Sequence, residues 1–507
     1  MAPRNPAPPG RSISLHRRSS VADRPNILLI HTDQHRFDAL GCSGNADIST
    51  PSIDRIAAHG VRYRRHFTVY PVCTPSRYSL LSGVYVRRHG GWTNHSTLQT
   101  HFPTFPRLLA ASGYRTAAVG KMHFTPTYLD VGFQEMRLAE QHGPGRHDDD
   151  YHRDLRAHGL IDRLDLVDQV LEFRRNAPEE YWKRFGAMAT DLPEEHHSTR
   201  WIGDRAVEML SEWRGHGHLL MVGFIKPHHP FDPPQRLAGL YDPERIALTS
   251  GWREAVDSKD LALSAGYFPH ESLSEAALRR VIAYYYASIT HIDEQVGRMI
   301  DCLEQRGLYR DTLVVVTSDH GEHLGYRHLL LKGGYLYDSL ARIPLIVKYP
   351  DSCREPRPDA GGFDDSLASN IDVAPTLLRR AGLEAPPEMN GRDLLAQEAD
   401  RGVVFAEAER GEQYMVRTGR RKLLVRRDQG TCRLFDLEED PLELHDVYDD
   451  PAYRRDREEL RQRLFEWALF ESRGGPYLDE DAPVIDRPNV PKDREAQRAA
   501  SRAYFQP

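Results

Sequence analysis

The stretch Asn26–Gln34, NILLIHTDQ, contains an apolar run at residues 27–30, which is followed after two residues by an acidic residue and an amide. A short apolar run bounded by polar residues is typical of a strand that a parallel sheet buries on both faces. The segment from Thr50 to Gly60 is predicted to be a helix, with Thr50 as its N-cap, a proline at its first position and a glycine at its end. The chain therefore opens with a strand followed by a helix.

The same alternation continues along the chain. Helical periodicity covers residues 105–111 and 278–303, and apolar strand-like runs cover residues 114–119, 219–224, 313–317 and 344–348. Strands that alternate with helices predict an α/β fold in which a mostly parallel central sheet is sandwiched by helices.

The character of the sequence divides the chain into four parts. Residues 1–24 are Pro-rich and basic and are predicted to be a disordered tail, and residues 25–400 form the α/β domain. Short β-like segments and a final helix in residues 401–475 predict a small antiparallel sheet plus helix. Residues 476–507 are a Pro- and charge-rich extension. Such an extension could wrap a second copy of the chain, so a homo-oligomer is one open alternative. Residues 134–200 and 231–275 are polar and weakly periodic, and we expect them to be insertions that wall a functional site.

Composition excludes several classes of protein. The 507 residues carry a formal net charge of -7, so no basic excess favours nucleic acid. No apolar run is long enough to span a bilayer, and no apolar core follows the basic N-terminus as in a secretory signal. The five cysteines are scattered and include no CxxC pair. We expect a cytoplasmic protein with mostly free thiols and no membrane contact.

Polar residues of chemical interest follow four of the predicted strands. Ligands bind outside the carboxyl ends of strands in open parallel sheets, so these residues should meet at one edge. They are Asp33 and Gln34, Lys121 and His123, Lys226 and His228, and Asp319 and His320.

A metal site is predicted within this group. Asp33, Asp319 and His320 suit a divalent ion, and Gln34 could add a neutral oxygen ligand. Buried carboxylates need a cationic partner. The imidazole favours Mn²⁺ or a similar ion over an all-oxygen calcium cage, although Ca²⁺ and Mg²⁺ remain open.

The most specific segment is Cys73-Thr74-Pro75-Ser76-Arg77, which resembles the CxPSR signature of the type I sulfatase family. The resemblance implies that a dedicated formylglycine-generating enzyme oxidises Cys73 to formylglycine, whose hydrate attacks the ester. A helix starting at Pro75 would add positive potential there. The alternative is a buried free thiol before a helix.

The resemblance extends over roughly residues 25–470. Gly120-Lys121-Met122-His123, Lys226-Pro227-His228, Thr317–Gly321, Lys332 and Phe435–Glu443 each resemble a family segment. The likeness implies an alkaline-phosphatase-like fold. It also implies that Asp33, Asp319 and His320 bind metal with the modified Cys73, that Arg77 and Lys121 hold the formylglycine and the ester oxygens, that His123 is the base, and that His228 and Lys332 bind the anion and protonate the leaving group.

Two positions depart from the common pattern of that family. Gln34 stands where a second acidic residue is usual, and His320 where asparagine is frequent. The combination resembles the branch with phosphonate monoester hydrolases and choline sulfatases, in which Asn94 would face the substrate. We therefore expect hydrolysis of small sulfate monoesters. Hydrolysis of phosphonate monoesters or phosphodiesters at the same site, and a non-catalytic protein that binds metal and anions, are the alternatives.

Overall fold

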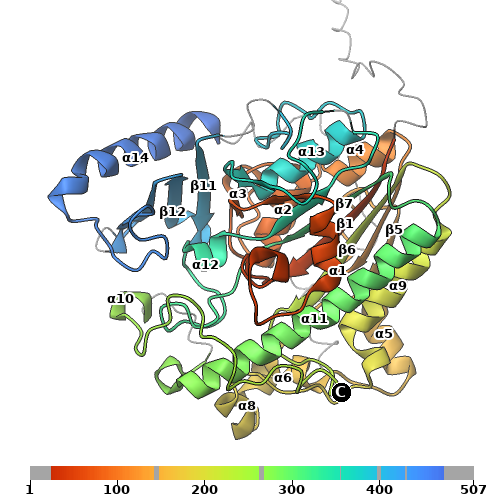
Figure 1. Cartoon of the computed structure of the whole chain (residues 1–507), viewed down its shortest axis with the longest axis horizontal. Coiled ribbons are helices and arrows are strands. Elements are labelled where there is room, and N and C mark those ends of the chain that lie inside the picture. The colour runs from red at the N-terminus through yellow and green to blue at the C-terminus, as the bar shows by residue number, and fades with distance from the viewer. Residues whose placement is uncertain are drawn as a thin grey trace, which may run out of the picture.

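The computed structural model describes residues 24–141, 148–261, 268–353, 355–396, 401–428 and 431–472 (Figure 1). The predicted N-terminal tail, apart from Arg24, and the predicted extension 476–507 lie outside the described residues. Two sheets of unequal size organise the rest, and a further pair of short strands, β3 (His66–Phe67) and β10 (Ala368–Ser369), joins residues far apart in the chain.

The larger sheet has eight strands in the order β5-β4-β6-β1-β7-β8-β2-β9. Their bounds are β1 Asn26–Asp33, β2 Val61–Tyr63, β4 Arg115–Gly120, β5 Glu135–Leu138, β6 His218–Pro227, β7 Thr312–Ser318, β8 Leu345–Lys348 and β9 Phe363–Asp364. The five strands from β5 to β7 are mutually parallel, whereas β8 is antiparallel to both β7 and β2. The predicted, mostly parallel sheet is confirmed.

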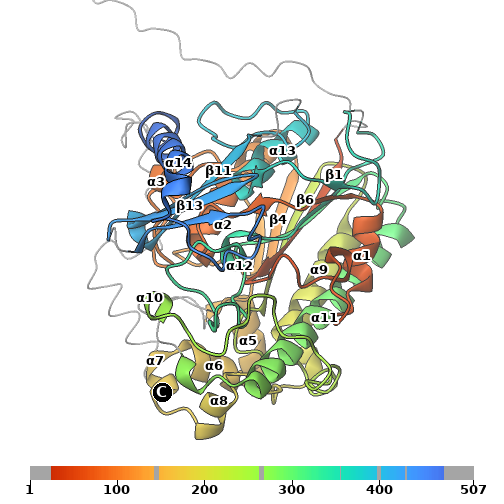
Figure 2. The same cartoon turned by 60° about the vertical axis from the view of Figure 1, so that its left-hand side comes forward.

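Helices cover both faces of this sheet, because its central strands are apolar on both sides (Figure 2). In β1, Ile27 and Leu29 join one hydrophobic cluster and Leu28 and Ile30 the other. The first cluster includes residues of α2 (Cys73–Ser82), α4 (Phe105–Ala111) and α13 (Val373–Arg380). The second includes residues of α1 (Pro51–Ala58), α9 (Ser198–Glu212) and α11 (Glu275–Gln305).

The start of α1 differs from its prediction in one detail. Thr50 is the N-cap residue, but its side chain makes no capping hydrogen bond to the helix backbone. Its hydroxyl donates to the Asp54 carboxylate at 3.0 Å and accepts the Gly41 N–H at 2.9 Å. The threonine therefore ties the preceding loop to the helix.

The smaller sheet is an antiparallel meander of β11 (Val403–Ala408), β12 (Gln413–Thr418), β13 (Arg421–Arg426) and β14 (Arg433–Asp436). Helix α14 (Arg454–Glu466) packs on it and ends in a π-helical turn, Trp467–Glu471 (Figure 1). Trp467 is fully buried, stacked on Phe405 and edge-on to Tyr85 of the segment before α3 (Val86–His89). The predicted antiparallel sheet and helix are confirmed.

The segments expected to be irregular insertions contain short helices. These helices are α5 Asp150–Ala157, α6 Arg163–Gln169, α7 Leu171–Arg175, α8 Glu179–Lys183 and α10 Ser258–Leu261. A further short helix, α12 (Asp338–Ala341), lies outside the insertions. Asp149 and Asp162 cap α5 and α6 with their side chains. Helices of four to eight residues are too short to display clear periodicity, so the sequence pattern missed them.

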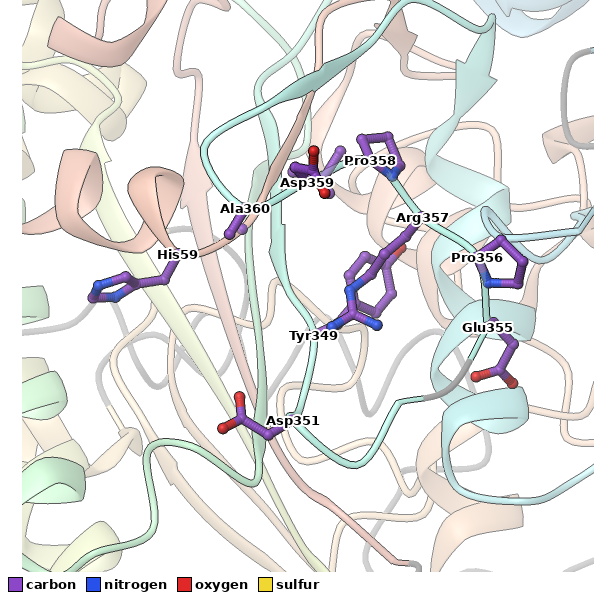
Figure 3. Close-up of a pocket in the computed structure, with 11 residues that line it drawn as sticks. His59, Tyr349, Asp351, Glu355, Pro356, Arg357, Pro358, Asp359 and Ala360 are labelled. Carbon is purple, nitrogen blue, oxygen red and sulfur yellow. The ribbon is translucent and has the colours of Figure 1, made fainter.

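A pocket of about 390 Å³ opens beside the end of β8 (Figure 3). It is lined by His59 and by the loop that runs from Tyr349 to Ala360, with Asp351, Glu355 and Arg357 among its charged residues. Because β8 runs antiparallel to β7, this pocket lies at the edge of the sheet where the parallel strands begin. No described helix has the length and apolar character needed to cross a bilayer.

Candidate active site

The carboxyl ends of four parallel strands meet at the other edge of the sheet. Asp33 is the last residue of β1, Lys121 and Asp319 directly follow β4 and β7, and His228 directly follows β6. Gly120 has a φ of 87°, and a Cβ there would lie 2.1 Å from the carbonyl oxygen of Gly223. Only glycine permits this approach, which turns the chain so that Lys121 reaches the site.

Buried charges are paired across these strand ends. Lys121 Nζ lies 2.9 Å from Asp33 Oδ2, and Arg77 of α2 donates to Asp33 Oδ2 at 2.9 Å and to Asp319 Oδ2 at 3.0 Å. Burial opposes the charge of Asp33, but Lys121 and Arg77 hold its pKa well below the usual range. Lys226, which was expected at the same edge, does not join this cluster; its ammonium group pairs with Asp232 instead.

Cys73 is the first residue of α2 and is fully buried. The helix starts two residues earlier than expected at Pro75; the first N–H groups of a helix need no intrahelical acceptor, so proline is tolerated there. Cys73 Sγ lies 3.6 Å from Asp33 Oδ1 and 3.3 Å from His320 Nε2. Burial, reinforced by Asp33, raises the pKa of this thiol to about 11.

Lys332 and His228 complete the surroundings of Cys73. Lys332 Nζ donates to Cys73 Sγ at 2.9 Å and lies 3.1 Å from His228 Nε2. His228 Nδ1 lies 2.6 Å from the backbone oxygen of His229 and so carries the proton, which leaves Nε2 as an acceptor for the ammonium group. Burial, reinforced by Lys332, lowers the pKa of His228 well below its usual value.

The residues present fit a divalent cation. Ligand atoms of Asp33, Cys73, Asp319 and His320 all lie within 4.8 Å of one another, and all four residues are buried. His320 Nδ1 lies 2.9 Å from the Gly321 carbonyl oxygen, which fixes the tautomer with Nε2 free to ligate. The backbone N–H of Gln34 donates to Asp319 Oδ1 at 3.0 Å, which brings this residue to the same place.

Two further predicted residues touch the backbone around Cys73. Asn94 Oδ1 accepts the N–H of Thr74 at 3.1 Å, and the Thr74 hydroxyl donates to the carbonyl oxygen of His123 at 2.8 Å. His123 has a φ of 56°, and the Glu140 carboxylate accepts the N–H groups of Met122 and His123 at 2.9 Å. All eleven predicted site residues thus lie in or beside one cluster, although their chemical roles are expectations.

The structure adds residues that the sequence pattern did not reveal. Gln141 accepts from Lys121 Nζ at 3.2 Å and donates to the backbone oxygen of His229 at 2.9 Å. The His229 ring is held in turn by Asp168 at 2.6 Å. Gln141 and Asp168 belong to the polar segment 134–200, and His229 directly follows His228. No motif or periodicity in the sequence indicated a role for these residues.

Two other groups of possible metal ligands occur in the described part of the chain. Asp154, His158 and His196 are not buried. The group of Glu194, His291 and Glu294 has both carboxylates already bound by Arg236, at 2.7 to 2.9 Å. Neither group includes a strand-end residue of the sheet.

Comparisons with known proteins agree with this geometry. A family model described as "Sulfatase" matches residues 25–383, and one described as "N-sulphoglucosamine sulphohydrolase, C-terminal" matches residues 327–469. The arylsulfatase of Clostridium perfringens is 29% identical over 493 residues, covering 90% of this chain and 96% of that protein. The choline-sulfatase of Rhizobium meliloti is 30% identical over 454 residues, covering 84% and 83%.

The fold also matches a solved structure. The crystal structure of the phosphonate monoester hydrolase of Agrobacterium radiobacter superposes with a TM-score of 0.72 at 23% sequence identity, covering 88% of this chain and 95% of that one. The alkaline-phosphatase-like architecture is thereby confirmed. With a family model matching most of its length and a paired-charge cluster at its strand ends, this chain belongs to the sulfatase family and is a sulfuric ester hydrolase.

Proposed function

We propose that this enzyme hydrolyses small sulfate monoesters with a formylglycine derived from Cys73 and one divalent cation, Mn²⁺ or Ca²⁺. Asp33, Gln34, Asp319 and His320 would hold the cation. The observation that carries the proposal is the position of Cys73, whose Sγ lies within 3.6 Å of a candidate metal-binding carboxylate, a candidate metal-binding imidazole and the Lys332 ammonium.

Two groups would supply chemistry that ordinary side chains lack. A bound divalent cation supplies Lewis acidity, which lowers the proton affinity of an oxygen nucleophile and screens the charge of the ester. A formylglycine hydrate supplies an attacking oxygen together with a second hydroxyl, whose deprotonation releases the sulfate.

The electrostatics of the cluster favour an anionic substrate. Three cationic side chains, Arg77, Lys121 and Lys332, face two carboxylates, Asp33 and Asp319, so one positive charge is in excess. In a buried site such fixed charges stabilise developing negative charge more effectively than water does. Arg77 and Lys121 hold Asp33 in its ionised form. They also fix the position of its carboxylate, so these side chains need not move during the reaction.

The remaining side chains handle the leaving group and the nucleophile. Lys332 and His228 touch each other beside Cys73, so an ester oxygen there could accept a proton from Lys332 while His228 holds the ammonium in place. His123, fixed by the Glu140 clamp on its backbone, would take the proton that releases the sulfate. Asn94 holds the Thr74 amide and so aligns the start of α2.

The experiment produces the protein with and without a formylglycine-generating enzyme. Intact-mass analysis then measures conversion of Cys73, and kcat/KM is measured for an aryl sulfate, a phosphonate monoester and a phosphodiester. We expect activity to scale with the converted fraction and the aryl sulfate to be turned over best. Full activity of unconverted protein would contradict the formylglycine, and much faster turnover of both phosphorus esters would assign the site to those substrates instead.

A further inference from the structure

Glu322, in the loop after β7, is fully buried and joins two parts of the site. Its Oε1 accepts the backbone N–H of Leu324 at 3.0 Å and the backbone N–H of Leu331. Its Oε2 accepts from Nε2 of Gln34. One carboxylate thus receives three N–H groups, which come from Gln34, the residue after Asp33, and from both ends of the loop before Lys332.

The contact with Glu322 decides which end of the Gln34 amide is available. Nε2 of Gln34 faces the carboxylate oxygen Oε2 of Glu322, so the Gln34 side chain turns its NH₂ group toward Glu322. Its Oε1 then lies at the opposite end, where it is buried and has no hydrogen-bond partner among the described residues. A buried oxygen without a donor is costly unless a cation or another donor satisfies it.

The two contacts with backbone amides decide where Lys332 lies. Between Glu322 and Lys332, four residues that are not glycine have positive φ, namely Leu324, Arg327, His328 and Leu331. The left-handed backbone conformation is unfavourable for residues other than glycine, so this loop needs an external restraint. Glu322 Oε1 binds both ends of it, and Leu331 directly precedes Lys332.

We propose that Glu322 is a positioning residue that orients Gln34 as an oxygen ligand for the divalent cation and fixes the loop that delivers Lys332 to Cys73. The inference rests on the proposed function, because it assumes that Gln34 shares a cation with Asp33, Asp319 and His320. The Glu322 carboxylate contacts Gln34, Leu324 and Leu331, and it contacts none of Asp33, Cys73, Asp319 and His320.

Glu322→Gln tests the orientation of Gln34. The new amide must keep its oxygen toward Leu324 and Leu331, so its NH₂ group faces Gln34 and forces that side chain to turn over. The metal then meets an NH₂ group, and we expect Mn²⁺ affinity, titrated calorimetrically into metal-free protein, to fall about 10–100-fold. Glu407→Gln is the matched control: Glu407 is also fully buried and accepts a backbone N–H, that of Arg87, but it lies in the smaller sheet, so Mn²⁺ affinity should not change.

The reciprocal exchange keeps the test informative if the single variant is unstable. In the double variant Glu322→Gln with Gln34→Glu, the amide at 322 donates to one carboxylate oxygen at 34 and leaves the other oxygen for the metal. We expect Mn²⁺ affinity to recover to within about fivefold of wild type. Gln34→Glu alone sets two carboxylates against each other, and it should lower the melting temperature of the metal-free protein.

Glu322→Ala separates the second role from the first. It removes the restraint on the loop before Lys332, so kcat should remain at least tenfold low even when Mn²⁺ is saturating, whereas saturating Mn²⁺ should restore most of the activity of Glu322→Gln. Wild-type affinity in Glu322→Gln, or a double variant no better than the single one, overturns the orientation role. A wild-type protein that binds neither Mn²⁺ nor Ca²⁺ would instead overturn the metal site of the proposed function, and this inference with it.

Discussion

Two lysines at opposite edges of the large sheet show how differently this fold treats the same side chain. Lys332, at the edge where the parallel strands end, lies against Cys73 and near Asp33; burial disfavours its charge, yet these neighbours raise its pKa. Lys348 of β8, toward the other edge, donates to three backbone oxygens, those of Tyr309, Arg310 and Thr312. Burial lowers its pKa to about 8. Cys73, Asp33 and Asp319 offset burial at Lys332, whereas Asp351, Asp311 and the backbone oxygens do not offset it at Lys348.

The same contrast separates the two concave regions. The pocket in Figure 3 takes its charged residues mainly from one loop, and Asp351, Glu355 and Arg357 are not buried there. The cluster around Cys73 takes its charges from α2, from the end of β1 and from the residues directly after β4 and β7. All of Asp33, Arg77, Lys121 and Asp319 are fully buried. Convergence of buried, paired charges from distant segments therefore identifies the site better than the volume of a pocket does.

Replacement of Cys73 should have the largest effect. Cys73→Ala removes the precursor of the proposed nucleophile, so we expect sulfate-ester turnover to fall on the order of 10⁴-fold or more. Mn²⁺ binding and the circular dichroism spectrum should be largely retained, because the carboxylates and His320 remain. Activity close to that of wild type would remove Cys73 from the chemistry.

Replacement of the two lysines should give unequal results. Lys332→Met removes a cation that touches Cys73, and kcat/KM should fall by about 10²–10³-fold. Lys348→Met removes a cation of equal size at the other edge and should change kcat/KM less than about threefold, when both variants are compared at equal folded fraction. Equal losses in the two variants would erase the functional distinction between the edges.

The pH dependence of stability should report on Lys348. Its folded pKa of about 8 lies below the unfolded value of 10.5, so between these pH values the unfolded chain binds more protons. Wild-type stability therefore gains up to about 3 kcal/mol from this residue as the pH rises from 8 toward 10.5. In urea titrations at pH 8, 9 and 10, Lys348→Met should lack this gain. Parallel pH profiles for the two proteins would show that Lys348 keeps its ordinary pKa.

The smallest effect is expected in the pocket of Figure 3. Arg357 donates to the Cys353 carbonyl oxygen at 3.0 Å and lies over the Tyr349 ring, at the edge of the sheet away from Cys73. Arg357→Ala should leave kcat/KM within about twofold of wild type, since surface substitutions away from a site are usually nearly neutral. A larger loss of kcat/KM, with the melting temperature unchanged, would mean that the pocket is energetically coupled to the Cys73 cluster.

The sequence predicted the positions that follow from strand periodicity. Asp33, Lys121, His228 and Asp319 could be assigned to one edge because each follows an apolar run in a parallel sheet. The antiparallel direction of β8 could not be predicted, because an apolar run does not encode the direction of its neighbour. Gln141 and Asp168 were missed for a different reason: they act through tertiary hydrogen bonds from short helices and loops, which leave no local pattern.

The sequence separation within the site sets a timescale for its assembly. Cys73 and Lys332 are in contact yet 259 residues apart. At about 5–20 residues per second, a ribosome needs roughly 13–50 s to pass from one to the other. During that interval the cysteine has been made but cannot yet be enclosed by its lysine, although the finished fold leaves it no exposed surface. An enzyme that modifies this thiol can therefore reach it most easily while the chain is still being synthesised.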